Sequence, residues 1–203
     1  MILKNTNYYY NNIIPNKLCD HLIHYFNVSK KENATVFGND GPENQHKNLE
    51  IRDSNIVWID DQWVYKDIIP LFSRVNKEAG WNFNISWFEK AQITKYGKGQ
   101  FYNWHPDQHP ESFKKERGKN LEGKIRKISM TMLLNDPSEY EGGDLEFKSF
   151  DDFANPQQYF IERKNLRKGS AIFFPSFLHH RVKPVTKGKR YSLVIWSCGH
   201  PYI

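Results

Sequence analysis

Apolar residues in the first third of the chain recur with the spacing of α-helical turns. Leu18, Leu22, Ile23 and Phe26 fall on one face of a helix with 3.6 residues per turn. Asn16 precedes this face, where a side-chain oxygen can cap the first free backbone N–H groups. The pattern predicts a helix that starts near Asn16 and packs one side against a core.

A second stretch with helical periodicity extends from Val64 to Val75. Asp60 or Asp61 precedes it in the position of a capping residue. Gly80 follows it, and glycine commonly ends helices because it tolerates a positive φ angle. The pattern predicts one helix between these signals.

The residues before the first predicted helix and between the two predicted helices do not follow helical spacing. Tyr8-Tyr9-Tyr10 lies before Pro15 in a segment that predicts an edge strand or an extended entry to the fold. Residues 29–49 are polar and contain glycine and proline, so they predict a loop, either ordered or flexible.

From Trp81 onward the chain consists of short apolar or alternating runs separated by turn residues. Such runs are typical of β-strands, and many of them after two helices favour an antiparallel sandwich or jelly roll with the helices on one outer face. The predicted fold class is therefore mainly β with flanking helices. The candidate strands are Trp81–Phe88, Glu89–Tyr96, Gln100–His105, Ile125–Leu134, Gly143–Phe147, Gln158–Ile161, Ser170–Phe174, Leu178–Val185 and Arg190–Ser197.

The length of 203 residues predicts one domain, residues 1–203, with a substantial core. Within it we expect residues 1–80 to form an N-terminal helical support region. Residues 81–198 are expected to form the β core that carries the functional site.

The composition limits the classes of partner. The net charge is +6, but basic residues are interleaved with acidic ones, so we expect a solvated surface and no nucleic-acid partner. The sequence shows no secretory signal pattern and no apolar run long enough for a membrane span, which predicts a soluble cytoplasmic protein. Cys19 and Cys198 could form one disulfide, although nothing in the sequence indicates an oxidising compartment.

His105-Pro106-Asp107 is the first candidate for metal chemistry. Side chains at i and i+2 of an extended chain leave the same face, so His105 and Asp107 can converge on one cation. The motif alone is a weak signal, because a strand-end histidine followed by a turn aspartate has the same spacing. Two ligands also do not close a site, so a third must come from elsewhere in the chain.

The third ligand is sought in the pair His179-His180. Neighbours on a strand face opposite ways, so only one of the two can point inward. His180 shares its face with Leu178 and Val182, whereas His179 shares its face with Arg181. We therefore predict His180 as the inward residue, with a hydrogen-bonded core histidine as the alternative. Two histidines and one carboxylate on one side of a metal are typical of non-haem Fe(II) oxygenases.

Arg190 begins the last candidate strand and shares a face with Ser192, Val194 and Trp196. A guanidinium on an apolar inward face needs an anion, because an unpaired buried charge is very costly. No acidic residue lies within that strand. The carboxylate of a bound organic acid suits this forked donor, and an internal salt bridge is the alternative.

Together these motifs resemble the Fe(II)- and 2-oxoglutarate-dependent dioxygenases, specifically the prolyl 4-hydroxylase-like branch. The resemblance covers roughly residues 50–198, and the order and spacing of its motifs are more specific than any one of them. The matching pieces are Arg52-Asp53-Ser54 with Trp58-Ile59, Gln92 with Tyr96, Gly99, Tyr102 and His105-Pro106-Asp107, Tyr140-Glu141-Gly142-Gly143-Asp144-Leu145, Lys168-Gly169 with Phe174-Pro175, and His180-Arg181-Val182 with Pro184-Val185, Gly188-Lys189-Arg190-Tyr191-Ser192 and Trp196.

The resemblance implies a double-stranded β-helix fold, which is a jelly-roll or cupin-like core, and it implies roles for individual residues. The implied iron ligands are His105, Asp107 and His180. Arg190 would pair with the distal carboxylate of 2-oxoglutarate, with Ser192 assisting. The implied cosubstrate pocket also includes Tyr96 and Tyr102.

The activity implied by the resemblance is hydroxylation of a prolyl residue in a peptide or protein, with conversion of 2-oxoglutarate to succinate and CO2. The implied cofactors are Fe(II), 2-oxoglutarate and O2, and ascorbate is a candidate reductant. Many prolyl hydroxylases carry lysine where Arg190 stands, which leaves the substrate open. The alternatives are the same iron chemistry on a free amino acid, a lipid or a nucleobase, and a non-catalytic cupin-like binding module.

Residues 111–124 form a charged insertion between His105-Pro106-Asp107 and the candidate strand at Ile125. Phe113 and Leu121 are its apolar residues, so it cannot build a core of its own. Loops of this length are often functional, which predicts a lid that is mobile without substrate and closes when a peptide binds. The alternative is a solvated surface excursion.

Overall fold

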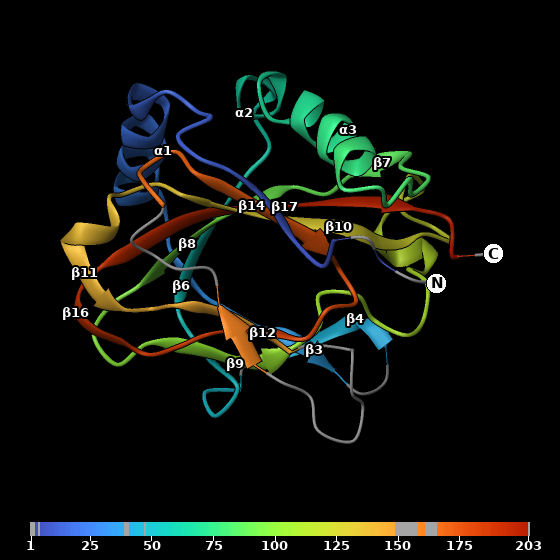
Figure 1. The fold of residues 1–203 in the computed structure, drawn as a ribbon. Coiled ribbons are helices and arrows are strands. Elements are labelled where there is room, and N and C mark those ends of the chain that lie inside the picture. Colours follow the sequence, from blue (N-terminus) through green and yellow to red (C-terminus); the bar gives the residue numbers. More distant parts are fainter. Residues whose placement is uncertain are drawn as a thin grey trace.

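Two β-sheets face each other, and the helices cover the outer face of the larger one (Figure 1). This arrangement comes from a computed structural model of the chain. The structure describes residues 3, 5–38, 41–46, 48–148, 158–160 and 166–202, with the backbone alone at 37–38, 41–46 and 158–160.

The major sheet has the strand order β1-β14-β10-β17-β8-β6-β2, and β7 pairs with β17 beside it. Neighbouring strands in it are antiparallel. Its strands are β1 (Tyr8–Tyr10), β2 (Glu32–Asn33), β6 (Asn55–Ile59), β7 (Trp87–Phe88), β8 (Ala91–Tyr96), β10 (Ile125–Leu133), β14 (Ala171–Pro175) and β17 (Arg190–Gly199).

The minor sheet has the strand order β13-β12-β15-β9-β5. Two further strand pairs, β11 with β16 and β3 with β4, complete the β-structure of the described residues. The strands are β3 (Val36–Gly38), β4 (Gly41–His46), β5 (Arg52–Asp53), β9 (Phe101–His105), β11 (Tyr140–Gly142), β12 (Leu145–Lys148), β13 (Gln158–Phe160), β15 (His180–Val182) and β16 (Val185–Gly188).

The main hydrophobic core lies between the helices and the major sheet. Leu22 and Phe26 come from α1 (Asn16–Val28), and Phe72 and Val75 from α3 (Ile69–Glu78); all four are fully buried. A smaller apolar cluster lies between the two sheets. The predicted class, mainly β with a double-stranded β-helix core and flanking helices, is confirmed.

The helices differ from the sequence predictions in two details. Asn16 is the first helical residue, so Pro15 occupies the capping position and no side chain caps the helix. The second predicted helix is divided into α2 (Gln62–Lys66) and α3. Pro70 lies in the first turn of α3, where a residue without a backbone N–H is tolerated but could not continue α2.

Two strand predictions and one loop prediction were partly wrong. The strand expected at Trp81–Phe88 is reduced to β7, because Asn82 adopts φ +52° and the Asn76 side chain binds the backbone of Phe83. The strand expected at Leu178–Val185 is divided into β15 and β16, and Pro184 between them has no N–H for a ladder. Residues 29–49, predicted as a loop, contain β2, β3 and β4. The strand at Gln158–Ile161 is observed as β13, with Ile161 outside the described residues.

Residues on both sides of position 80 contribute to the sheets, since β1, β2 and β6 join the major sheet and β5 joins the minor one. The division into a helical support region and a β core stays a prediction.

Cys19 and Cys198 are both buried and unpaired, so they form no disulfide. In the described part of the chain, no helix combines the length and apolarity that crossing a membrane requires.

Candidate metal centre

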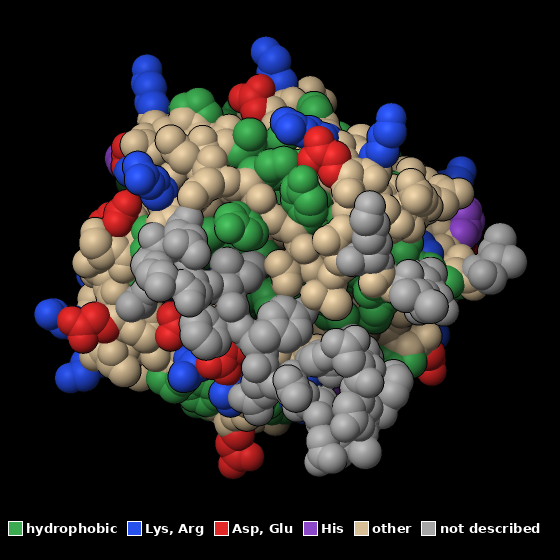
Figure 2. All heavy atoms as spheres, in the orientation of Figure 1, with side chains coloured by type: hydrophobic (Ala, Val, Ile, Leu, Met, Phe, Trp, Pro, Cys, Tyr) green, Lys and Arg blue, Asp and Glu red, His purple; other side chains and the backbone are tan. Residues whose placement is uncertain are grey.

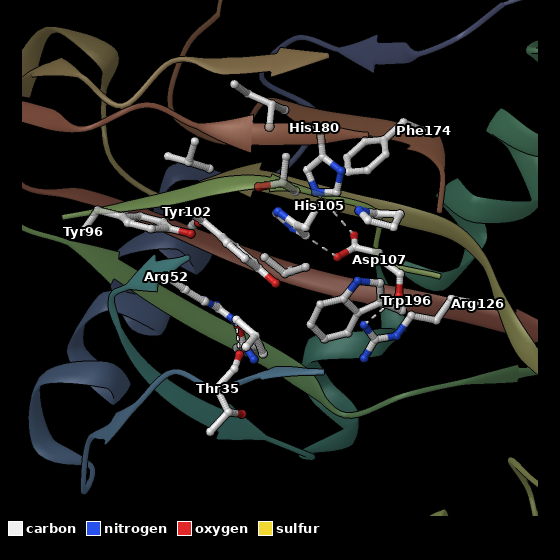
Figure 3. Close-up of a pocket in the computed structure, with 18 of the residues that line it drawn as sticks. Thr35, Arg52, Tyr96, Tyr102, His105, Asp107, Arg126, Phe174, His180 and Trp196 are labelled. Atoms are coloured by element: carbon white, nitrogen blue, oxygen red, sulfur yellow. Dashed lines mark hydrogen bonds and ion pairs between the residues drawn. The ribbon is translucent and has the colours of Figure 1, made fainter. Parts of the chain in front are cut away.

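A pocket of about 80 Å³ lies between the two sheets, and the predicted metal ligands converge on it (Figure 3). His105 ends β9 and His180 begins β15; these strands are paired in the register that sets the two histidines opposite each other. Asp107 follows β9 and is held by backbone hydrogen bonds from its own N–H and that of Gln108 to Ser176. Residues from distant parts of the chain are thereby brought together.

The ligand atoms of His105, Asp107 and His180 all lie within 4.8 Å of one another. The two Asp107 carboxylate oxygens face different histidines: Oδ1 lies 3.7 Å from His105 Nε2, and Oδ2 lies 3.7 Å from His180 Nε2. These separations are longer than a hydrogen bond, and they leave space between the three groups.

The hydrogen bonds of both histidines orient them for metal binding. His105 Nδ1 lies 2.7 Å from the Asn103 carbonyl, and His180 Nδ1 lies 2.9 Å from the Leu178 carbonyl. A carbonyl can only accept, so each Nδ1 carries a proton, and the tautomer selected in this way has its lone pair on Nε2. Metal-bound histidines are commonly held in this way.

The electrostatics also fit a divalent metal. Burial lowers the pKa of His180 to about 4, so its imidazole is neutral at pH 7. Burial by itself would raise the pKa of the Asp107 carboxyl, but the two histidines and Arg126 lower it far below its usual range. Two imidazoles and one carboxylate form the donor set that non-haem Fe(II) sites use.

His179 points away from this cluster. It is exposed, whereas His180 is buried together with Leu178 and Val182. The alternation of the strand therefore predicted the inward histidine correctly.

Arg190 and Ser192 lie at the start of β17 and line the same pocket. Both are buried, and Arg190 Nη1 donates to Ser192 Oγ at 3.1 Å. Among the described residues, no carboxylate lies within 4.0 Å of the Arg190 guanidinium. An internal salt bridge, the alternative considered from the sequence, is absent from this part of the chain. The guanidinium is available for an anion in the pocket.

Tyr96 and Tyr102 line the pocket as well; Tyr102 lies on β9 with His105, and Tyr96 ends β8 of the opposite sheet. The Tyr96 ring lies 5.6 Å from the Arg190 guanidinium carbon. The Tyr102 ring stacks on the imidazole of His105 with their planes at 11°, and burial raises the pKa of its phenol to about 12. Tyr102 therefore stays a neutral donor and also restrains the His105 ring.

Gly142 and Gly143 precede β12 and have positive φ angles, +70° and +66°. A Cβ atom on Gly142 would lie 2.3 Å from the Pro184 carbonyl oxygen. On Gly143 it would lie 3.0 Å from Cδ of Arg190. The pair therefore allows a close approach of the backbone that a side chain would block.

Two further arginines, Arg52 and Arg126, line the pocket. Arg52 of β5 donates to Gln92 Oε1 at 2.7 Å and lies over the Tyr102 ring. Arg126 of β10 lies 3.9 Å from the centroid of the Trp196 ring and donates to the Asp107 carbonyl at 3.3 Å (Figure 3). Arg52 was among the residues that carry the family resemblance, although no role was predicted for it. Arg126 was not predicted; the signal that could have indicated it is a charged residue within strand β10, which is buried along its whole length.

Arg126 is neutralised by Glu89, which precedes β8. The guanidinium binds both carboxylate oxygens, and Glu89 also receives a hydrogen bond from Arg117 at 3.2 Å. The Arg126 pKa is raised by Glu89, against the effect of burial. This network connects the pocket wall to the insertion at residues 111–124.

The insertion is closed by backbone hydrogen bonds. The N–H of Phe113 donates to the Lys124 carbonyl, and the N–H of Gly123 donates to the Phe113 carbonyl. Phe113 is buried, whereas Lys114, Lys115 and most of the residues that follow are exposed. The segment is therefore anchored at its base, and its mobility stays a prediction.

Comparisons of sequence identify the relatives of this chain. The family model described as the 2OG-Fe(II) oxygenase superfamily matches residues 91–198. A PKHD-type hydroxylase of Picosynechococcus sp. is 36% identical over 104 residues, which cover 51% of this chain and 39% of the relative. A PKHD-type hydroxylase of Psychrobacter sp. is 33% identical over 108 residues, covering 51% and 36%. The chain thus spans less than half the length of these relatives.

Comparisons of structure extend over nearly the whole chain. A Pseudomonas putida prolyl-4-hydroxylase matches with a TM-score of 0.67 and 19% identity, covering 95% of this chain and 91% of that one. A Trichoplax adhaerens prolyl hydroxylase, solved in complex with a hypoxia inducible factor peptide fragment, matches with a TM-score of 0.70 and 19% identity, covering 95% and 83%. At this identity the likeness shows the fold. Because the family model covers more than half of the chain, including the pocket residues from Gln92 to Trp196, the chain belongs to the 2OG-Fe(II) oxygenase superfamily.

Proposed function

We propose that this protein is an Fe(II)- and 2-oxoglutarate-dependent dioxygenase that hydroxylates a prolyl residue in a peptide or protein. The observation that carries the proposal is the convergence of His105, Asp107 and His180 on one pocket that also contains the buried Arg190, which has no carboxylate partner among the described residues. Family membership supports the chemistry, and the PKHD-type and prolyl hydroxylase relatives support the substrate class.

In this proposal His105 and His180 hold Fe(II) through Nε2 and Asp107 holds it through a carboxylate oxygen. Their Nδ1 hydrogen bonds to backbone carbonyls keep both imidazoles in the tautomer that can ligate. The stacked Tyr102 ring limits rotation of His105. Fe(II) held by these three residues would supply the chemistry of O2 activation, coupled to oxidative decarboxylation of 2-oxoglutarate to succinate and CO2.

Arg190 binds the distal carboxylate of 2-oxoglutarate, and Ser192 assists it. The forked guanidinium matches a carboxylate with two parallel hydrogen bonds, and the buried pocket strengthens their attraction because little water screens it. Tyr102 offers a neutral hydroxyl donor, and Tyr96 forms the adjacent wall. Arg190 therefore both neutralises and orients the cosubstrate.

Trp196 and Arg126 are the residues that we assign to the substrate side of the pocket. Trp196 Nε1 is buried and has no hydrogen-bond partner among the described residues. An unsatisfied buried donor is costly, and an oxygen of a bound molecule can satisfy it. A peptide carbonyl offers such an oxygen, while the indole ring gives a prolyl ring an apolar surface.

The surface agrees with a peptide substrate better than with a nucleic acid. On the face drawn in Figure 2, lysine and arginine side chains are interspersed with aspartate and glutamate and do not gather into one basic patch. A basic stripe is the usual feature of nucleic-acid binders.

We include a cytoplasmic location in the proposal, which the two unpaired, buried cysteines support.

The first test is a titration of the protein with Fe(II) and 2-oxoglutarate in the absence of oxygen. We expect a visible metal-to-ligand charge-transfer band, and its absence would contradict the proposal at the level of the metal centre. The second test is incubation of a proline-containing peptide library with Fe(II), 2-oxoglutarate, O2 and ascorbate. We expect the mass of one added oxygen atom in a subset of peptides.

The two tests also separate the alternatives. A charge-transfer band without any modified peptide would indicate that the substrate belongs to another chemical class. Failure of both tests would favour a non-catalytic binding module. Succinate should form in amounts that match the oxidised peptide.

A further inference from the structure

A second groove, with a volume of about 580 Å³, lies next to the metal pocket. We call it the aromatic groove and define it by its lining residues. One wall is formed by Trp58 and Asp60 at the end of β6 and by residues 87–90, and the other by residues 116–121 of the insertion. None of these residues is a candidate metal ligand.

The aromatic groove and the metal pocket share one lining residue, Trp58. Within the pocket, Trp58 packs against Trp196, with 6.3 Å between the ring centroids. Glu89 and Arg117 line the groove on the other side, and Glu89 binds Arg126 of the pocket wall. Trp58 and the Glu89–Arg126 ion pair therefore place the groove beside the wall of the metal pocket.

Trp87 exposes a large apolar surface in this groove. Its exposed fraction is 41%, and Phe88 and Leu121 beside it are half-buried. Tryptophan is costly to leave in water, and it is enriched among residues that dominate binding at interfaces. Aromatic-lined grooves of this kind bind extended, proline-containing peptides, which lose little conformational entropy on binding.

The charges in the groove cancel. Lys90 pairs with Asp60 at 3.1 Å, and Arg117 pairs with Glu89 at 3.2 Å. Glu116 and Lys119, both exposed, carry opposite charges. The groove therefore has no net attraction for a charged ligand, which favours an uncharged segment with apolar side chains over an anionic polymer.

We propose that the aromatic groove binds substrate residues that flank the hydroxylated residue, in extended conformation, and that it selects proline or aliphatic side chains at Trp87. The inference rests on the proposed function, since it assigns the flanking part of the same peptide. The insertion thereby contributes one wall of the substrate site through Leu121 and its neighbours.

The test compares two peptides that share a central proline. One is a blocked tripeptide, which is too short to leave the pocket because an extended residue spans roughly 3.3 Å. The other has fifteen residues, with proline and alanine flanks that reach the groove. Trp87→Ala should raise KM for the long peptide about 10-fold, as expected for loss of an anchor aromatic residue, and should leave kcat and the tripeptide kinetics unchanged.

Tyr9→Ala is the matched control, because Tyr9 is 42% exposed but lies on β1, away from the groove. It should change neither KM. Leu121→Ala tests the opposite wall and should also raise KM for the long peptide alone. If Trp87→Ala behaves as Tyr9→Ala does, the groove is not a substrate site.

A binding measurement keeps this inference separate from the proposed function. The long peptide is titrated into the protein loaded with Fe(II) and 2-oxoglutarate without oxygen, by calorimetry. If Trp87→Ala weakens this binding about 10-fold, the groove is supported as a peptide site even when no peptide is hydroxylated. The lack of hydroxylation would then contradict only the proposed function. Equal binding by wild type and Trp87→Ala, or binding of a single-stranded oligonucleotide in place of the peptide, would overturn the inference.

Discussion

The Glu89 carboxylate and the Arg126 guanidinium form a buried, two-pronged ion pair immediately behind the candidate metal ligand Asp107. Glu89 precedes β8 and Arg126 lies on β10, so the pair bridges strands that are separated by β17 in the major sheet. Arg126 in turn donates to the Asp107 carbonyl and stacks on Trp196. The pair thus supports both the metal side and the substrate side of the pocket.

Removing Glu89 should strongly destabilise the protein. Glu89→Ala leaves the Arg126 charge buried without its carboxylate, which costs about 3–5 kcal/mol in the free energy of unfolding. Chemical denaturation measures this change. The matched control is Glu141→Ala, which breaks the exposed pair with Lys187 and should cost less than about 1 kcal/mol. Similar losses of unfolding free energy in the two variants would show that the buried pair stabilises the protein no more than the exposed pair does.

Replacing a candidate ligand should abolish metal binding while the fold is retained. We predict that His105→Ala, Asp107→Ala and His180→Ala each weaken Fe(II) affinity by more than about 100-fold, because even residues that only orient ligands contribute 10–100-fold. His179→Ala is the control, since His179 is exposed. Calorimetric titration with Fe(II) under anaerobic conditions, with circular dichroism for the fold, measures both effects. Retained affinity in His180→Ala with lost affinity in His179→Ala would reverse the assignment.

Arg190→Met should raise the dissociation constant for 2-oxoglutarate about 30- to several-thousand-fold, since truncating one partner of a desolvated charge pair costs roughly 2–5 kcal/mol. Arg190→Lys should be milder, because lysine keeps the charge but loses the forked geometry. Lys189→Met is the control, as the neighbouring Lys189 is exposed. An unchanged dissociation constant in Arg190→Met would remove Arg190 from the cosubstrate site.

Residues 111–124 should respond to loss of their anchor. Arg117→Ala removes a half-buried ion pair worth about 1 kcal/mol, which raises the open population about 5-fold. Trypsin cleavage after Lys114 and Lys115 should accelerate by this factor. In the wild type, cleavage should slow when Fe(II), 2-oxoglutarate and a peptide substrate are all present without oxygen. A cleavage rate that is the same with and without these ligands would identify the segment as a surface excursion and not a lid.

Lys127 should make stability depend on pH. It lies at a bulge in β10, almost fully buried, with its Nζ 3.5 Å from the centroid of the Tyr202 ring, and burial lowers its pKa to about 8. The unfolded chain has the ordinary lysine pKa of about 10.4, so it binds more protons between these values, and stability rises with pH across this window. The penalty for the charged form is complete below the folded pKa.

Lys127→Met should therefore raise Tm at pH 7, by about 2–4 °C for each kcal/mol recovered, and should raise it less at pH 10. The control is Lys77→Met, at an exposed position on α3. Thermal melts at the two pH values measure the difference. A gain that is equal at both would show that packing, and not the charge of Lys127, is responsible.

Local sequence pattern was sufficient for the orientation of the pocket residues. Alternation along a strand assigned His180 to the inner face and His179 to the outer one, and it grouped Arg190 with Ser192, Val194 and Trp196, all of which line the pocket. The reason is that the period of two is a property of the backbone and needs no knowledge of neighbouring strands. The mainly β class followed from the same short-range periodicity.

The tertiary structure decided which of these faces meet. The register of β9 with β15 brings His105 opposite His180, and the order of strands in the major sheet brings Glu89 to Arg126. Neither relationship has a signature in spacing, because the partners are tens of residues apart and are selected by the packing of whole sheets. The break between α2 and α3 comes just before Pro70, and the shortening of the strand at Trp81–Phe88 depends on the hydrogen bonds of Asn76; hydrophobic periodicity records neither. The sequence by itself thus determined the chemistry each segment offers, and only the fold determined the pocket in which these groups meet, because long-range pairing, and not local propensity, sets their distances.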